Sequence, residues 1–217
     1  MKGLFITFEG TEGCGKSTQA GLLAERLRRT GQAVRVLREP GGTPIGEEIR
    51  HTLKHSRLNH AMTAEAELLL LNASRAQLVR EAIRPALAAG EVVLCDRFYD
   101  STVAYQGYGR QLDLKMVRTL IDFAVGETRP DLTLMLAVPL EVSEARRRQR
   151  QGNGPAVRDR FEEADRAFFE RVEAGFRQIA AEEPQRVALI DSTREVEKVS
   201  ADIWSRVASL LRQTGRA

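Results

Sequence analysis

Directly after an apolar run at residues 4–8, the chain carries the nine residues Gly10, Thr11, Glu12, Gly13, Cys14, Gly15, Lys16, Ser17 and Thr18. They fit the pattern G-x-x-x-x-G-K-[ST] and predict a nucleotide-binding loop between a strand and a helix. Glycine lets successive N–H groups turn inward around an anion, and the helix N-terminus also favours phosphate. We expect Lys16 to reach the β- and γ-phosphates and Ser17 to bind Mg²⁺. A Gly-rich turn without a ligand is the alternative, which the adjoining strand and helix patterns disfavour.

The chain length of 217 residues is typical of one large domain, and we expect a single domain over 1–217. No apolar run is long enough to span a bilayer, and the first strand begins too early for an export signal, which favours the cytoplasm. The net charge is only +3, with 33 basic residues scattered among 30 acidic ones. We therefore expect neither a nucleic acid nor a membrane as partner.

Cysteine and histidine give no sign of a disulfide framework or a metal site. Cys14 and Cys95 have no C-x-x-C spacing, so we expect reduced thiols. His51 and His55 have helical spacing, but no third ligand lies at metal-site spacing around them. We interpret the two histidines as a solvated pair and expect no zinc.

Five strand patterns alternate with helix patterns along the chain. The strands are predicted at residues 4–8, 33–37, 91–96, 132–138 and 187–190. Helices are predicted from the nucleotide-binding loop (the P-loop) to about 30, and at 44–54, 63–90, 114–126 and 164–182. The helix at 63–90 is expected to kink or restart at Pro85. A last helix is predicted from the apolar residues Val196, Val199, Ile203, Val207 and Leu210. Residues 56–62 are expected to form a loop, and 98–109 fit no element. The order predicts an α/β fold with a five-stranded parallel sheet covered on both faces.

Two charged segments follow predicted strands. Asp96 ends a buried strand and suits a Mg²⁺-linked acid, and Arg97 suits an anion beside it; the alternative is a surface Asp-Arg pair. The Arg-rich segment at about 141–162 contains Gly and Pro, so we expect a mobile lid that brings a cation to the transferring phosphoryl group. A solvated basic face is the alternative. The candidate cations are Arg148, Arg150, Arg158 and Arg160.

Four motifs together resemble those of bacterial thymidylate kinases. They are residues 8–19, the Arg-Glu-Pro-Gly-Gly-Thr at 38–43, Asp96-Arg97 with Ser101, and the Ala-Tyr-Gln-Gly at 104–107. The resemblance implies ATP-dependent phosphorylation of dTMP to dTDP in dTTP synthesis, with Mg²⁺. It further implies a homodimer and a P-loop NTPase three-layer sandwich with strand order 2-3-1-4-5.

The same resemblance implies roles for individual residues. Glu12 resembles the acid beside the deoxyribose, Arg50 and Arg97 the acceptor-phosphate arginines, and Arg75 the residue that hydrogen-bonds thymine. Tyr105 resembles the aromatic residue that crowds the sugar 2′ position, and the same pocket is lined by Ser101, Thr102 and Gln106.

Two positions differ from patterns found in the family. Leu71 stands where many members carry a thymine-stacking Phe, and Gly13 stands where some members carry a P-loop arginine. In the variant without that arginine, the lid supplies the catalytic cation.

The chemistry of a phosphate acceptor needs no general base, because its oxygen is already ionised at neutral pH. Catalysis then consists of positioning and charge neutralisation. Two other functions are alternatives: a P-loop kinase for another nucleoside monophosphate or a deoxynucleoside, and a regulatory nucleotide switch. The absence of an N-K-x-D motif from the sequence disfavours the switch.

Overall fold

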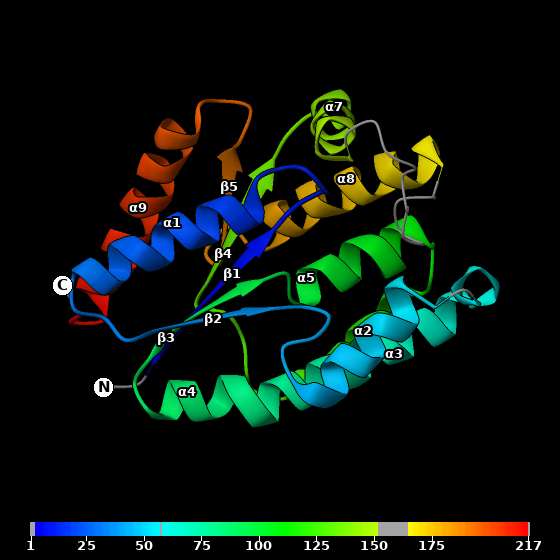
Figure 1. Ribbon diagram of the computed structural model, residues 1–217, viewed down its shortest axis with the longest axis horizontal. Helices are drawn as coiled ribbons and strands as arrows, with labels where there is room; N and C mark the ends of the chain where they lie inside the picture. Colours follow the sequence, from blue (N-terminus) through cyan, green and yellow to red (C-terminus); the bar gives the residue numbers. More distant parts are fainter. Residues whose placement is uncertain (1–2, 57, 152–164, 217) are drawn as a thin grey trace.

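The computed structural model describes residues 3–56, 58–151 and 165–216. Its sheet lies between two layers of helices (Figure 1). The strands are β1 (Leu4–Glu9), β2 (Val34–Arg38), β3 (Val92–Asp96), β4 (Leu132–Ala137) and β5 (Val187–Asp191). All neighbouring strands pair in parallel, in the order β2-β3-β1-β4-β5. The predicted sheet and its order are confirmed.

The helical segments of the described residues flank this sheet. They are α1 (Lys16–Arg29), α2 (Pro44–Lys54), the 3₁₀ turn η1 (Asn59–Ala61), α3 (Ala64–Leu78), the π-helical η2 (Val79–Ile83), α4 (Arg84–Ala88), α5 (Tyr99–Thr102), the π-helical η3 (Val103–Gly109), α6 (Leu114–Val125), α7 (Leu140–Gln151), α8 (Arg166–Glu182) and α9 (Val196–Gln213).

Strand β1 separates two apolar cores, because alternate side chains point to opposite faces of a sheet. Leu4, Ile6 and Phe8 pack with residues of α1 and α9. Phe5 packs on the other face with residues of α3, α6 and α8. Since both faces are covered, every residue of β1 is buried.

Helices α2 and α3 each begin after a threonine whose side chain caps the first helical turn. Thr43 accepts a hydrogen bond from Gly46 N at 3.0 Å, and Pro44 follows at the first helical position. Thr63 caps α3 through Ala66 N at 3.2 Å. The helix predicted at 44–54 therefore has the bounds expected from sequence.

The helical pattern at 63–90 is interrupted where Pro85 was expected to kink or restart it. Proline has no N–H, so residue 85 cannot continue the backbone hydrogen bonding. The chain passes through the π-helical η2 just before this point, where Arg84 N bonds to Val79 O. Within the expected loop at 56–62, the structure adds the short turn η1.

Within residues 98–109, which were assigned no element from the sequence, Tyr99 to Gly109 form the continuous helical segment α5–η3. Gly, Ser and Tyr are weak helix formers, so propensity gave no helix signal here. Most of this segment is buried and it packs on α8, which means that tertiary contacts decide its conformation.

In α9 the predicted apolar face needs a correction. Val196 is exposed, and the buried residue near the C-terminus is Leu211 rather than Leu210.

Candidate active site

The loop at residues 10–15 connects β1 to α1 at the carboxyl edge of the sheet. Gly10 has a φ of 131°, and a Cβ there would lie 2.3 Å from Leu136 O. Gly15 precedes α1 with a φ of 95°. Lys16 is only 7% exposed and donates to Gly10 O at 3.1 Å and Thr11 O at 2.7 Å. The lysine predicted to meet phosphate is thus curled into its own loop.

Ser17 and Asp96 bring two oxygens together beside the loop. Ser17 Oγ donates to Asp96 Oδ2 at 2.5 Å. Hydroxyl and carboxylate oxygens are ligands that Mg²⁺ accepts, usually with waters and substrate phosphates completing the shell. The pair therefore fits a magnesium ion bound at the head of α1.

Arg97 forms an ion pair with Glu12 at 3.2 Å, and not the surface pair with Asp96 that was the alternative interpretation. Its guanidinium also donates to Gly10 O at 3.1 Å, to Ser101 Oγ at 2.9 Å and to Tyr105 OH at 3.4 Å. Burial opposes its charge, but Tyr105 and nearby carboxylates raise its pKa above the usual range. Arg97 is a permanent cation that joins the P-loop to α5 and η3.

Glu9, which sequence reasoning missed, contacts two residues that adjoin Arg97. Its carboxyl group accepts from Phe98 N at 2.7 Å and from Ser101 Oγ at 2.5 Å. Burial raises the pKa of Glu9 to about 8, and the charge of Asp100 adds to this effect. The sequence could have indicated Glu9, because this residue ends a buried strand, on the face opposite Phe8.

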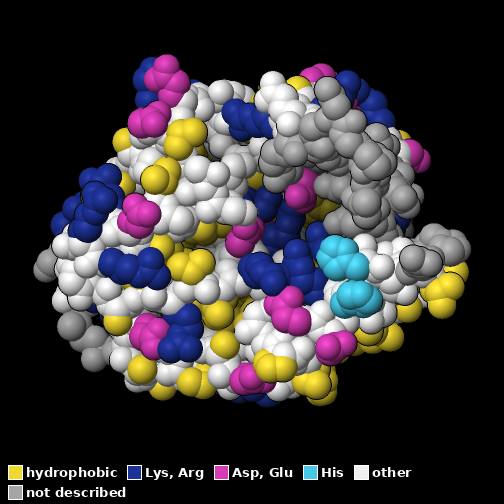
Figure 2. Space-filling view, viewed as in Figure 1, with side chains coloured by type: hydrophobic (Ala, Val, Ile, Leu, Met, Phe, Trp, Pro, Cys, Tyr) yellow, Lys and Arg dark blue, Asp and Glu magenta, His cyan; other side chains and the backbone are white. Residues whose placement is uncertain are grey.

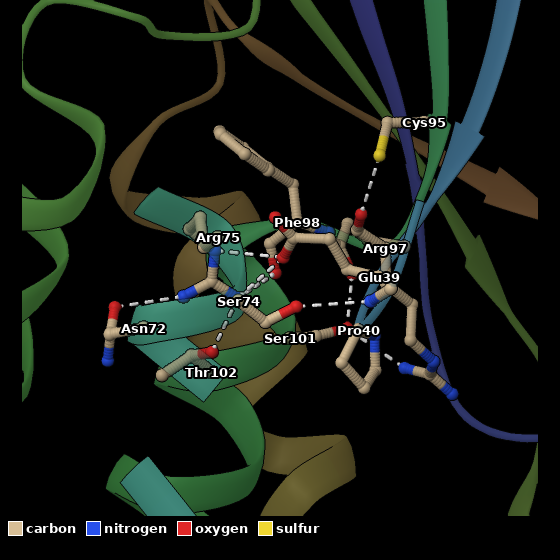
Figure 3. A network of polar contacts seen from close by, with 12 residues as sticks. Glu39, Pro40, Asn72, Ser74, Arg75, Cys95, Arg97, Phe98, Ser101 and Thr102 are labelled. Carbon is tan, nitrogen blue, oxygen red and sulfur yellow. Dashed lines mark hydrogen bonds and ion pairs between the residues drawn. The ribbon is translucent and has the colours of Figure 1, made fainter. Parts of the chain in front are cut away.

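Arg75 lies at the centre of a buried polar network (Figure 3). Its side chain, 2% exposed, donates from Nε to Glu39 Oε2 at 2.9 Å, and from its other nitrogens to Asn72 Oδ1 at 3.0 Å and Thr102 Oγ1 at 2.9 Å. Burial raises the pKa of Glu39 to about 7, although Arg75 opposes the rise. The network fixes a planar donor group from α3 beside the end of β2.

One cavity of about 650 Å³ connects these groups. Lys16, Ser17 and Asp96 line it. It is also lined by every residue predicted to bind the acceptor: Glu12, Arg50, Leu71, Arg75, Arg97, Ser101, Thr102, Tyr105 and Gln106. Figure 2 shows Lys and Arg side chains gathered in and around the hollow at the centre of this face. The cavity is built for a large anion.

Other residues of the same cavity were not predicted. Ser192, Arg194 and Val196 lie after β5 and line the end near α7. Arg146, from the Arg-rich segment, donates to Ser192 O at 3.0 Å, and Ser192 Oγ donates to Cys14 O at 2.7 Å. The sequence could have indicated these residues, because open parallel sheets bind ligands at the carboxyl ends of their strands and the loop after β5 lies at such an end.

Among the candidate lid cations, Arg148 has a described side chain, and it is not part of the cavity lining. Arg148 is on α7, pairs with Glu144 at 3.3 Å and has a side chain that is 74% exposed. The side chain of Arg150, and Arg158 and Arg160 altogether, lie outside the residues that the structure describes.

The remaining sequence features are simple. Cys14 and Cys95 are buried free thiols, and His51 and His55 are exposed with ring centroids 6.0 Å apart. Within residues 3–56, 58–151 and 165–216, no helix has the length and apolar character needed to cross a membrane.

Comparison with known proteins gives one consistent result. Residues 8–203 match the family model described as thymidylate kinase. A thymidylate kinase from Pseudomonas fluorescens is 49% identical over 97% of this chain and 98% of its own, and one from Syntrophotalea carbinolica is 46% identical over 97% and 98%. The crystal structure of thymidylate kinase from Ehrlichia chaffeensis superposes with a TM-score of 0.76 at 32% identity, covering 96% of this chain and 99% of that one.

Proposed function

Because this chain belongs to the thymidylate kinase family, we propose that the cavity described above is where it transfers the γ-phosphoryl group of ATP to dTMP. The protein is an ATP-dependent dTMP kinase that yields dTDP for dTTP synthesis and uses Mg²⁺. Its fold is that of a P-loop NTPase.

The observation that carries this proposal is the shared cavity of the P-loop and the acceptor pocket. Lys16 and Ser17 line it from the nucleotide side, and Arg75 and Tyr105 line it from the acceptor side. Arg97 contacts both walls, through Gly10 O and Ser101 Oγ. Two phosphates bound at these ends therefore approach each other at Arg97, as an in-line transfer requires.

The chain's cations and oxygens have distinct tasks in the transfer. Lys16 leaves its loop carbonyls to neutralise the donor phosphates, while Ser17 and Asp96 hold Mg²⁺. When bound, the ion neutralises charge on the phosphate oxygens. Arg50 and Arg97 bind the acceptor phosphate. Asp96 removes no proton, since the acceptor oxygen is already ionised.

The acceptor's nucleoside is bound deeper in the cavity. Arg75 donates to the thymine, and Leu71 contributes an aliphatic contact where many family members have Phe. Glu12 lies beside the deoxyribose, and Tyr105 packs on its 2′ position. The wall between them includes Ser101, Thr102 and Gln106.

The Arg-rich segment at about 141–162 is proposed to act as the lid. Near its start, Ser143 Oγ donates to Glu12 O at 2.5 Å, which joins α7 directly to the P-loop. Gly13 supplies no side-chain cation. One arginine among Arg148, Arg150, Arg158 and Arg160 therefore neutralises the transition state.

We further propose that the protein is a cytoplasmic homodimer. Leu69 on α3 and Met116 and Phe123 on α6 are exposed, Phe123 by 80%. The two helices lie side by side, since Arg80 just beyond α3 donates to Ala124 O of α6 at 2.8 Å. A second copy covering this face would remove the apolar side chains from water. Sedimentation of Phe123→Asp against wild type tests the dimer.

The experiment that tests the function is an ADP-release assay with ATP and each nucleoside monophosphate and deoxynucleoside. We expect dTMP to give the highest kcat/KM and Lys16→Met to be inactive with an unchanged fold. A preference for another acceptor supports the first alternative. Nucleotide hydrolysis that no acceptor accelerates supports the regulatory switch.

A further inference from the structure

Glu67 on α3 is fully buried and holds two side chains of the segment that runs from η3 to Arg110. Its Oε1 accepts from Gln106 Nε2 at 2.8 Å. Arg110 donates to Oε1 from Nε at 3.1 Å and to Oε2 from Nη2 at 3.0 Å. Of these residues only Gln106 lines the cavity. Glu67 thus lies behind the pocket wall and acts on it through Gln106.

The contact with Glu67 determines which end of the Gln106 carboxamide is used. An ionised carboxylate only accepts hydrogen bonds, so the amide NH₂ must face Glu67. Gln106 is 1% exposed, and its Oε1 is buried without a hydrogen-bond partner among the described residues. A buried acceptor without a partner destabilises a protein unless a ligand supplies the donor. The contact with Glu67 therefore leaves Gln106, a residue of the cavity lining, with an acceptor oxygen that has no partner among the described residues.

We propose that Glu67 is a positioning residue that selects the acceptor base by fixing the orientation of Gln106. This inference rests on the proposed function of the cavity. Thymine presents a ring N–H next to the carbonyl at position 4, whereas cytosine presents a ring nitrogen acceptor next to an amino group. The Gln106 acceptor matches the thymine N–H, and the neighbouring Arg75 donor matches its carbonyl. With a cytosine base, the Gln106 acceptor would face the ring nitrogen, which is also an acceptor, and the Arg75 donor would face the amino group, which is also a donor.

The surroundings of Glu67 keep this arrangement rigid. Arg110 contacts both carboxylate oxygens, and its guanidinium lies 4.8 Å from the centroid of the Phe168 ring. Phe168 in turn packs edge-on against Tyr105, with centroids 6.0 Å apart. Gln106 thus contacts Glu67 directly, whereas Arg110 and Phe168 connect Glu67 to Tyr105.

The test compares dTMP with 5-methyl-dCMP, two acceptors that differ only at ring positions 3 and 4. In Glu67→Gln, the new amide can donate to Gln106 Oε1, so the Gln106 carboxamide can turn over. We expect the ratio of kcat/KM for dTMP to that for 5-methyl-dCMP to fall about ten-fold or more, with the KM for ATP unchanged. Glu182→Gln is the matched control. Glu182 also accepts from a glutamine and an arginine, Gln178 at 3.0 Å and Arg118 at 2.7 Å, but it lies outside the cavity lining.

A double mutant separates positioning from a merely structural role. If Glu67 acts through Gln106, then Glu67→Gln changes the ratio in the wild type but not in a Gln106→Ala background. An equal change in both backgrounds, or a wild-type ratio in Glu67→Gln, overturns the proposal. If Glu67→Gln does not fold, Glu67→Asp keeps the charge for Arg110 and withdraws the acceptor from Gln106. It must then lower the ratio, and a wild-type ratio again overturns the proposal. Failure of the proposed function is distinguishable, because the wild-type enzyme itself would then prefer an acceptor other than dTMP.

Discussion

The hydroxyl of Ser17 donates to the carboxylate of Asp96 across 2.5 Å, although 79 positions separate the two residues in the chain. The sheet topology accounts for this contact. Ser17 lies in the first turn of the helix that follows β1, and Asp96 ends β3, which is paired in parallel with β1. Parallel strands bring their carboxyl ends to one edge, so two oxygens suited to Mg²⁺ meet there.

Asp96→Asn keeps the shape of the side chain but removes its charge. We expect kcat to fall about 10²-fold or more and the Mg²⁺ concentration needed for half-maximal rate to rise. Both quantities come from a magnesium titration at saturating ATP and dTMP. An unchanged magnesium dependence would remove Asp96 from the metal site.

Arg97→Ala removes the cation that we propose to bind the acceptor phosphate. We expect the KM for dTMP to rise more than the KM for ATP, with kcat/KM for dTMP reduced about 10²-fold, because charge-assisted hydrogen bonds to the acceptor are lost. Arg97→Lys keeps the charge without the planar fork and is expected to restore part of the activity. The assignment is reversed if the KM for ATP rises and that for dTMP does not.

The places of the five strands along the chain could be predicted because their apolar runs are short and end at Gly, Pro or charged residues. The P-loop glycines and the Thr43-Pro44 start of α2 are local signals of the same kind. The strand order came from the family resemblance, and Figure 1 shows its result, with β1 at the centre of the sheet.

The buried supports of the site could not be predicted from local patterns. Glu9, Glu39 and Glu67 are carboxyl groups whose burial depends on partners far away in the chain, at Ser101, Arg75 and Arg110. Helical structure at 99–109 likewise depends on packing against α8. Sequence reasoning found residues that line the cavity and missed most of those that hold them in place.

Glu9 is expected to make stability depend on pH. Its pKa is raised from 4.5 to about 8, so the folded protein binds this proton more tightly than the unfolded chain. The stabilisation is therefore complete below pH 4.5 and is lost as pH rises towards 8, by on the order of a few kcal/mol. Glu39, with a pKa of about 7, acts in the same direction.

The measurement is the Tm between pH 5 and pH 8. Glu9→Gln cannot titrate, so its Tm should decrease less over this interval than that of wild type. Glu65→Gln, at an exposed glutamate of α3, is the control and should follow wild type. Parallel curves for wild type and Glu9→Gln would contradict the assignment of the shift to Glu9.

The lid arginines are expected to act in the transition state. Single alanine variants at Arg148, Arg150, Arg158 and Arg160 should include one in which kcat and kcat/KM fall by similar factors, up to about 10³-fold. Arg148, which pairs with Glu144 on the exposed face of α7, is expected to have the smallest effect. Steady-state kinetics with both substrates varied decide this. If all four variants keep the wild-type kcat, the Arg-rich segment is a solvated basic face and not a catalytic lid.

Tyr105 is expected to select the sugar. Its ring is buried and packs edge-on against Phe168 and Phe176, with centroids 6.0 and 6.1 Å away, while its hydroxyl accepts from Arg97 at 3.4 Å. A ring held in this way cannot move aside for a 2′-OH, and it offers that hydroxyl no partner at the ring face. A desolvated hydroxyl without a partner costs about 1–3 kcal/mol, which is roughly a ten- to hundred-fold preference for dTMP over its ribonucleotide analogue.

Two substitutions distinguish the ring from the hydroxyl of Tyr105. Tyr105→Ala should narrow the preference chiefly by raising kcat/KM for the ribonucleotide, since the obstructing ring is gone. Tyr105→Phe keeps the ring and removes the hydroxyl that contacts Arg97, so it should keep the preference. The ratio of kcat/KM for the two acceptors, measured in wild type and both variants, is the readout. The same ratio in Tyr105→Ala as in wild type would mean that the ring only fills the core and that another group reads the sugar.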